Sequence, residues 1–261
     1  MEGEISNPQP LQEETYDMSG ARLALTLCVT EAREGSEADL DALERMFHQL
    51  RFENTTKTNP PFQQFLDEMK TFQETLDSWE EPVSCAFVVL MAHGDEGLLK
   101  GVDEEMVKLD DLFEALNNKN CEALRGKPKV FIMQACRGEH RDLGETIGGD
   151  QVVMIKQDHP QTIPTYTDTL HVYATMEGYI AYRHDQKGSC FIQTLVEVFT
   201  EKKGPILELL TEVTRLMAEA ELMQEGRARK VNPEIQSTLR KRSTSNKSPT
   251  APCPGLFLSA P

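Results

Sequence analysis

The chain has 261 residues, of which 39% are apolar, so it can bury the core of one large α/β domain or of two small ones. Its formal net charge is −16, and residues 1–150 carry 31 acidic and 14 basic side chains, a net charge of −17. Such a field repels nucleic acids and anionic membranes, so both are set aside as partners.

The six cysteines lie at least 15 residues apart along the chain. This spacing gives no Cys-x-x-Cys pair for zinc or redox chemistry and no disulfide pattern, so we expect a reducing compartment, no metal and no cofactor. The longest apolar run, residues 85–92, is too short to span a membrane, and the acidic first residues do not form a secretory signal. We expect a cytoplasmic protein, with the nucleus as the alternative compartment.

The first half of the chain alternates strand-like and helical patterns. Residues 1–20 are polar with two prolines and are expected to form a flexible leader. Unbroken apolar runs predict buried strands at 22–29 and 85–91. Apolar residues three or four positions apart predict helices at 36–50 and 62–76.

The second half continues this alternation. A helix is predicted at 109–116, and the apolar run from Lys129 to Ala135 predicts a buried parallel strand. Residues 139–168 hold glycines and prolines without periodicity, which is typical of a functional or disordered loop. Then a strand, two helices and a strand are predicted at 171–175, 190–200, 205–223 and 234–242. The Ser-, Thr- and Pro-rich residues 243–261 are expected to form a disordered tail.

Strands that alternate with helices predict an α/β sheet covered by helices on both faces. In this arrangement Arg33, His93, Cys136 and Arg183 each come shortly after a strand. Successive parallel strands have their carboxyl ends at one edge of the sheet, where ligands bind in such folds. We therefore expect these four separated residues to meet at that edge.

Cys136 and His93 are candidates for nucleophilic catalysis. A thiol becomes a good nucleophile when it ionises near a cation or a helix N-terminus, and a nearby histidine can protonate the departing amine. The alternative is that Cys136 is a structural cysteine of the core, which is the commoner role of a lone cysteine. The other five histidines lack such a context and are expected to be structural or solvated.

The sequence Gln134-Ala-Cys-Arg-Gly138, with His93-Gly94 upstream of it, resembles the signature of the caspase family. The resemblance covers residues 16–242 and includes Arg33, in Arg-Glu-Gly-Ser-Glu-Ala-Asp-Leu-Asp, and Arg183, in Tyr-Arg-His-Asp-Gln-Lys-Gly-Ser. It implies a mixed, mostly parallel six-stranded sheet with helices on both faces, and a cysteine endopeptidase that cleaves after aspartate. Within the family the chain is most similar to the short-prodomain type of cornifying epidermis, which implies a role in keratinocyte terminal differentiation.

The resemblance assigns the catalytic roles. His93 and Cys136 would form the catalytic dyad, and the backbone N–H groups of Gly94 and Cys136 would form the oxyanion hole. No metal takes part. Ala92 replaces the serine that usually precedes the histidine, which bears on subsite preference rather than on the chemistry.

The resemblance also assigns the substrate-binding residues. Arg33, Gln134 and Arg183 match the family's pocket for aspartate, because two guanidinium groups and an amide suit one carboxylate. Tyr182 and Cys190, which would also contact the substrate, stand where tryptophans are common in the family. Since cysteine is far smaller than tryptophan, this predicts an apolar space that accepts tryptophan or tyrosine four residues before the cut.

By the same resemblance the peptidase consists of a large part, residues 21–140, and a small part, residues 166–242, joined by an inter-subunit processing segment, residues 141–165. One covalent loop cannot easily supply both walls of the pocket, so activation is expected to require a cut between the parts. The candidates for a self-type cut are Asp142, Asp150, Asp158 and Asp168. Ile155, within an apolar run, is the candidate for a protease of hydrophobic specificity.

The implied partners are protein substrates with an exposed aspartate, an activating protease, and a second large and small pair in a homodimer. The residues after Arg242 lack the apolar continuation usual in the family's terminal strand, which puts dimerisation in question. Two alternatives are a catalytically silent caspase homologue that binds partners and a nucleotide-binding α/β protein. The first should lack a residue of the dyad or pocket and the second should have a glycine-rich phosphate loop, and the sequence shows neither feature.

Overall fold

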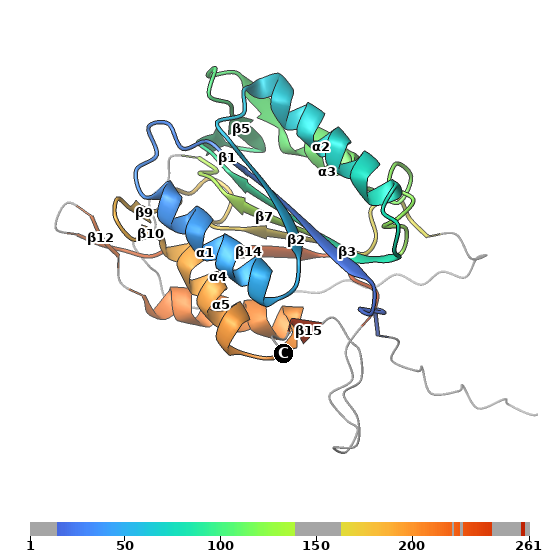
Figure 1. The fold of residues 1–261 in the computed structure, drawn as a ribbon. Coiled ribbons are helices and arrows are strands. Elements are labelled where there is room, and N and C mark those ends of the chain that lie inside the picture. Colours follow the sequence, from blue (N-terminus) through green and yellow to red (C-terminus); the bar gives the residue numbers. More distant parts are fainter. Residues whose placement is uncertain (1–14, 139–162, 221, 225–226, 242–256, 259–261) are drawn as a thin grey trace, which may run out of the picture.

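The computed structural model describes residues 15–138, 163–220, 222–224, 227–241 and 257–258, and its centre is a six-stranded sheet (Figure 1). The strands are β1 (Ala21–Cys28), β2 (Glu53–Thr58), β3 (Val83–Met91), β7 (Lys129–Gln134), β8 (Thr169–Tyr173) and β14 (Glu234–Ser237). They are ordered β14-β8-β7-β3-β1-β2, with β14 antiparallel to β8 and the other pairs parallel. The predicted mixed, mostly parallel sheet is confirmed.

The strands β3 and β7 lie in the middle of the sheet and are buried along their whole length. Both are almost continuous apolar runs, as strands covered on two faces require. Their parallel register pairs Met91, the last residue of β3, with Gln134, the last residue of β7. The residues that follow these two strands therefore emerge at the same level of the sheet edge.

In the described ranges five helices cover the sheet. They are α1 (Ser36–Gln49), α2 (Phe62–Asp77), α3 (Leu109–Glu114), α4 (Cys190–Glu201) and α5 (Ile206–Glu219). Helices α1, α4 and α5 lie on one face, and α2 and α3 lie on the other (Figure 1). Each long helix presents a stripe of apolar side chains to the sheet, for example Phe65, Met69 and Phe72 of α2. Coverage of both faces was predicted and is confirmed.

Short strands form four smaller sheets around this core. They are β4 (Gly94–Asp95), β5 (Leu98–Lys100) and β6 (Met106–Lys108), then the pairs β9 (Arg183–His184) with β10 (Gly188–Ser189), β11 (Gly204–Pro205) with β15 (Phe257–Leu258), and β12 (Leu222–Gln224) with β13 (Arg227–Arg229). The first sheet begins directly after His93, and the β9–β10 hairpin carries Arg183. Two small sheets therefore border the edge where the predicted site lies. No helix in the described ranges is long and apolar enough to cross a bilayer.

Several element boundaries differ from the prediction. The helix predicted at 205–223 ends at Glu219, where the chain turns into the β12–β13 hairpin. The strand predicted at 234–242 ends at Ser237. The strand β2 was not predicted, because its sequence Glu-Asn-Thr-Thr-Lys-Thr is polar and lies at the sheet edge, where one side of the strand faces solvent.

The structure describes residues 15–20 of the predicted leader and residues 257–258 of the predicted tail. The expectation of a flexible leader does not hold for residues 15–20, because Tyr16 and Met18 are buried in the main core. The expectation of a disordered tail does not hold for β15, whose two residues pair antiparallel with β11. Residues 1–14 and the rest of the tail lie outside the described residues.

Candidate active site

Three adjacent parallel strands bring the predicted site residues to one edge of the sheet. Arg33 follows β1, and His93 and Cys136 each lie two positions after the last residue of β3 and β7, respectively. Because Met91 pairs with Gln134 at the ends of these strands, the histidine and the cysteine lie at the same level on neighbouring strands. Arg33, His93 and Cys136 therefore all follow the carboxyl ends of central strands, which is the edge predicted for them from the sequence.

The imidazole of His93 is oriented by a backbone carbonyl. Its Nε2 lies 3.2 Å from the carbonyl oxygen of Ala32, so a proton on Nε2 leaves Nδ1 free to exchange a proton elsewhere. Ala32 has φ = 52°, a left-handed conformation that is unusual for a residue with a side chain and that often marks a functional site. A Cβ at Gly94 would lie 3.0 Å from the carbonyl oxygen of Cys136, so only glycine lets these two loops approach so closely.

The thiol of Cys136 faces a segment of the small part, residues 176–183. Its Sγ lies 3.9 Å from the carbonyl oxygen of Ala181. The N–H of Arg137 donates to Tyr179 at 3.0 Å, and the N–H of Gly178 donates to the carbonyl of Arg137 at 2.6 Å. Two backbone hydrogen bonds therefore join this segment to the residues beside the thiol, and the segment forms one wall of the site.

Exposure distinguishes Cys136 from the core cysteines. Cys28, Cys85 and Cys121 are buried, and burial raises the pKa of Cys28 to about 11 and those of the other two thiols to about 12. Such thiols stay protonated and inert at neutral pH. Cys136 is partly exposed, so it is not a buried structural cysteine.

Arg33 is buried and held by the ends of β1 and β7. Its Nη1 donates to the carbonyl of Val29 at 2.8 Å, and its Nη2 lies 3.5 Å from the carbonyl oxygen of Gln134. The side chain is only 2% exposed, yet its Nε has no acceptor in the described part of the chain. Burial lowers the pKa of Arg33, and the charge of Arg183 lowers it further. A buried cation with an unpaired N–H and a like charge nearby favours an anionic ligand.

The other predicted pocket residues come from both parts of the chain. Arg183 donates from its Nε to the carbonyl of Glu34 at 2.6 Å, which brings the β9–β10 hairpin against the segment that carries Arg33. Gln134 is buried, and neither its Oε1 nor the buried hydroxyl of Tyr182 has a partner within the described ranges. The hydroxyl of Tyr182 could donate to a carboxylate, whereas Oε1 of Gln134 can only accept, for example from a peptide N–H.

Cys190 lies in a different setting. It begins α4, packs against the main core, and its Sγ lies 3.5 Å from the Sδ of Met217 in α5. Met217 therefore fills part of the space that a small residue at position 190 leaves. The apolar subsite predicted there would therefore be narrower than the difference between cysteine and tryptophan suggests.

A network around Arg137 was not predicted from the sequence. Its guanidinium forms an ion pair with Glu234 of β14, donates to the carbonyl of Thr175 at 3.4 Å and lies 4.0 Å from the centre of the Tyr173 ring. Because Arg137 directly follows Cys136, this network ties the backbone beside the thiol to the edge strand of the sheet. Its partner is 97 residues away, so no local pattern could identify it.

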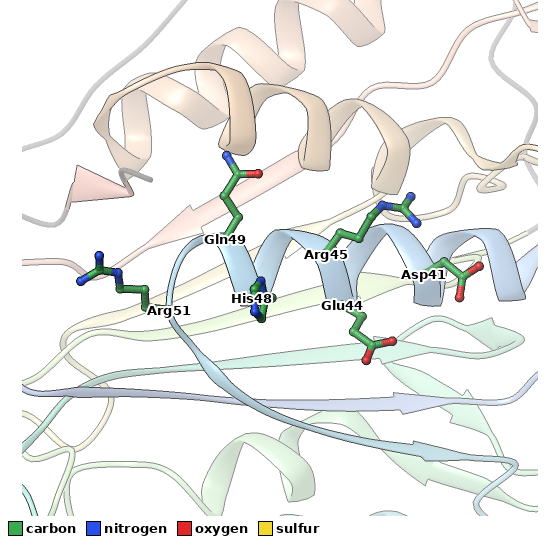
Figure 2. A pocket seen from close by; sticks show the side chains of 6 residues that line it. All are labelled: Asp41, Glu44, Arg45, His48, Gln49 and Arg51. Carbon is green, nitrogen blue, oxygen red and sulfur yellow. The ribbon is translucent and has the colours of Figure 1, made fainter. Parts of the chain in front are cut away.

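A separate hollow of about 850 Å³ lies along the outer face of α1 (Figure 2). The side chains that line it are Asp41, Glu44, Arg45, His48, Gln49 and Arg51. Gln49 reaches the neighbouring helix and donates to the carbonyl of Thr200 at 3.1 Å. None of the side chains that line this hollow is among the predicted site residues. Among the residues that the structure describes, no three potential metal ligands cluster together.

The predicted processing sites fall into two groups. Asp142, Asp150, Ile155 and Asp158 lie outside the described residues. Asp168 is fully buried and receives hydrogen bonds from Tyr16 and Arg240, so the expectation that it is a cleavage site was wrong for the folded chain. A protease must bind several residues around the cut in extended form, and a buried aspartate cannot be presented in that way.

Comparison with known proteins shows the family of the chain. The family model described as the caspase domain matches residues 21–244. The chain belongs to the caspase family. It is 76% identical to human caspase-14 over 238 residues, which cover 91% of this chain and 98% of the relative. It is 69% identical to mouse caspase-14 over 253 residues, which cover 93% and 98%.

More distant caspases agree with this assignment. Bovine caspase-3 is 31% identical over 247 residues, which cover 88% of this chain and 86% of the relative. The crystal structure of caspase-1 from Spodoptera frugiperda superposes with a TM-score of 0.71 at 26% identity, over 84% of this chain and 89% of that one. The fold is therefore a caspase fold, and the chain is a cysteine-type endopeptidase.

Proposed function

We propose that this caspase cleaves peptide bonds after aspartate, with Cys136 as the nucleophile and His93 as the acid and base. The observation that carries the proposal is the pair of neighbouring arginines, Arg33 and Arg183, of which Arg33 lies at the sheet edge that carries Cys136. Arg33 is buried with an unpaired Nε, and Arg183 is close enough to lower its pKa. A carboxylate would neutralise both guanidinium groups, and the amide of Gln134 could add a further hydrogen bond.

The proposed reaction has two steps, acylation of the thiol and hydrolysis of the thioester. His93 takes the proton of the Cys136 thiol, the thiolate adds to the main-chain carbonyl carbon of the substrate aspartate, and the N–H groups of Gly94 and Cys136 stabilise the oxyanion. The carbon–nitrogen bond then breaks as His93 gives its proton to the departing amine, which leaves a thioester. A water molecule that loses a proton to His93 attacks the thioester, releases the new carboxyl terminus and restores the thiol. The carbonyl of Ala32 keeps the imidazole oriented throughout.

Activation by a cut between the two parts is also proposed. Arg33, His93 and Cys136 belong to the large part, residues 21–140, whereas Tyr182, Arg183 and the wall beside the thiol belong to the small part, residues 166–242. A cut in the connecting segment, with Asp142, Asp150 and Ile155 as the candidate sites, would let the small-part loops adjust to a substrate. The activating protease would be a partner of the precursor.

The wider biology is proposed from resemblance. The outer side of β14 is unpaired in the described part of the chain, which supports a homodimer of large and small pairs formed along this edge. The high identity to caspase-14 supports a role in terminal differentiation of epidermal keratinocytes, in the cytoplasm or the nucleus. Substrates would be proteins with an exposed aspartate.

Peptide cleavage tests the proposed chemistry. The cut enzyme should hydrolyse a tetrapeptide ending in aspartate at least about a hundredfold faster than its asparagine twin, because the amide cannot pair with two guanidinium groups. Cys136→Ala should reduce turnover to that of a mock preparation, and an Asp-based thiol-reactive peptide should label the wild type alone. Turnover retained by Cys136→Ala would disprove the role of this thiol. Equal activity before and after limited proteolysis would disprove activation by cutting.

A further inference from the structure

Three side chains from distant parts of the chain meet at the end of the sheet opposite the candidate active site. Tyr16 is only 3% exposed, and its hydroxyl donates to Oδ1 of Asp168 at 2.7 Å. Arg240 donates to the same carboxylate from Nε at 3.1 Å and from Nη2 at 2.8 Å. The backbone N–H of Arg240 donates to the hydroxyl of Tyr16 at 3.0 Å. We call these three residues the Tyr16 clasp.

Asp168 is well satisfied in this position. It is fully buried, and a buried carboxylate is costly unless cations and donors surround it. Burial alone raises its pKa, but the hydrogen bonds from Arg240 and Tyr16 outweigh burial and hold the pKa of Asp168 below its usual value. The residue also has φ = 60°, and its backbone bonds to Lys129 and Thr238 fix this left-handed conformation. The clasp is therefore a fixed feature of the fold.

The residues just before Asp168 are also bound to the large part. The N–H of Asn118 donates to Thr165 at 2.9 Å, and its side-chain Nδ2 donates to Pro164 at 2.9 Å. The Nζ of Lys129 donates to Oδ1 of the Asn118 amide at 2.9 Å. The start of the small part is thus bound to the large part by Asn118 on one side and by Tyr16 on the other.

We propose that the Tyr16 clasp is a joint between the two parts of the enzyme. Tyr16 lies in the segment that leads into the large part, and Asp168 and Arg240 lie near the two ends of the small part. Tyr16 therefore bonds across to the small part, while Gly20 of the same segment donates to Oγ of Ser84 in the large part. Once the connecting segment is cut, this non-covalent contact adds to the pairing of β7 with β8 in holding the parts together. The inference rests on the proposed cut between the parts.

The uncut chain tests the clasp without any processing. In a Cys136→Ala background, Tyr16→Phe keeps the ring but removes the donor to a buried charge, and should lower the folding equilibrium constant in urea by about tenfold or more. The control is Tyr166→Phe, because Tyr166 is 51% exposed and should change the constant less than about twofold. In an Asp168→Asn background Tyr16→Phe should lower the folding equilibrium constant by a smaller factor, because the charged acceptor is gone. The clasp would be overturned if Tyr16→Phe and Tyr166→Phe changed the folding equilibrium constant equally. It would also be overturned if the free-energy losses of Tyr16→Phe and Asp168→Asn were additive.

The cut form tests the joint. The chain carries a tag before residue 1, is cut by limited proteolysis in the connecting segment and is held on a matrix by the large part. The small part of Tyr16→Phe should elute at a lower urea concentration than that of Tyr166→Phe. Elution at the same concentration would overturn the joint even if the clasp stabilises the uncut chain. If cutting never raises peptidase activity, the proposed activation fails, while both clasp measurements still decide this inference.

Discussion

Arg33 and Arg183 lie close together, but the fold holds them in different ways. Arg33 comes from the large part, is buried, and contacts Val29, Cys28 and Gln134 at the ends of two central strands. Arg183 comes from a two-residue strand of the small part, and its Nε is bonded to the carbonyl of Glu34. One arginine is built into the core edge, and the other is supplied by a surface hairpin.

This difference indicates which half of the pocket depends on the state of the chain. The side that carries Arg33 is fixed as soon as the sheet forms, because its contacts are the carbonyls of Val29 and Gln134 and the Sγ of Cys28, at the ends of β1 and β7. The Arg183 side depends on the close approach of two loops. A Cβ on Gly35 would lie 2.3 Å from the carbonyl oxygen of His184, so the loops meet through a glycine with φ = 83°. Substitution of Arg33 should therefore lower both activity and stability, whereas substitution of Arg183 should lower activity alone and by a smaller factor.

The largest effect is expected from Arg33→Lys. A single ammonium cannot bond Val29 and Gln134 and also bind a carboxylate with a planar fork, so kcat/KM for an aspartate peptide should fall by about a hundredfold or more. The variant should also unfold at a lower temperature, since a buried carbonyl loses its donor. Peptide kinetics and thermal unfolding measure the two losses.

The matched control for Arg33→Lys is Arg45→Lys on the exposed face of α1 (Figure 2). This change should alter neither activity nor stability beyond experimental error. An Arg33→Lys enzyme that retains more than about a third of the wild-type kcat/KM would show that this arginine does not bind the substrate carboxylate.

A smaller effect is expected from Arg183→Lys. The ammonium keeps the charge near the pocket but loses the Nε bond to Glu34 and the bidentate geometry, so kcat/KM should fall by about tenfold. The unfolding temperature should stay unchanged, because the side chain is anchored on the surface. A loss of stability equal to that of Arg33→Lys would contradict the contrast between a core arginine and a hairpin arginine.

Much of the fold could be predicted because its central strands are local apolar runs. The strands β1, β3 and β7 and the helices α1, α2 and α4 follow directly from such patterns. The edge strand β2 lacks the pattern, since its polar residues pair only with β1 on one side. Its place in the sheet is set by tertiary contact, and β propensity is weak without burial.

The candidate site was predictable in its side chains and not in its backbone contacts. Cys136, His93 and the two arginines carry recognisable residue types. The strand order brings Arg33, His93 and Cys136 to one edge, whereas Arg183 comes from the separate β9–β10 hairpin. The carbonyl of Ala32 carries no side-chain signal, because any residue has a carbonyl, and only the fold aims this one at His93. The ion pair between Arg137 and Glu234 joins two strands far apart in sequence, so it too is visible only in the fold.

That ion pair provides a third prediction, expected to be weaker than the arginine changes. Glu234→Gln removes one of the two carboxylates that pair with Arg137 but keeps the shape, while Glu177 stays 3.7 Å from Nη2, so the backbone beside Cys136 should become less well fixed. We expect kcat/KM to fall about fivefold with little change in KM, because the loss concerns the position of the nucleophile. Ser237→Thr on the same strand is the control, because Ser237 is exposed and the change keeps its hydroxyl, and an equal loss there would point to general damage to β14.

The pH dependence sharpens this prediction. Burial raises the pKa of Glu234, but hydrogen bonds from Gln236 and Arg137 outweigh it and hold the pKa below its usual value. A carboxyl whose folded pKa is lowered contributes stability above its unfolded pKa of about 4.3, and this contribution is lost as the pH falls through the folded pKa. The stability difference between wild type and Glu234→Gln should therefore be full at neutral pH and shrink below about pH 4. A difference that stays constant down to pH 3 would exclude the ion pair as its source.

The smallest effect concerns the residue four positions before the cut. Cysteine at position 190 leaves room for an aromatic side chain, whose full burial is worth about 1.5 to 3 kcal/mol, but Met217 already contacts Cys190 and takes part of that room. We therefore expect tryptophan to be preferred over aspartate at this substrate position, and Cys190→Trp to lower the ratio of their kcat/KM values about threefold, because only part of the ring is buried there. Met217→Ala should act in the opposite direction, since it widens the same space, although it also lowers stability by leaving a cavity. A ratio that favours aspartate in the wild type, or that neither substitution changes, would show that α4 and α5 do not shape this subsite.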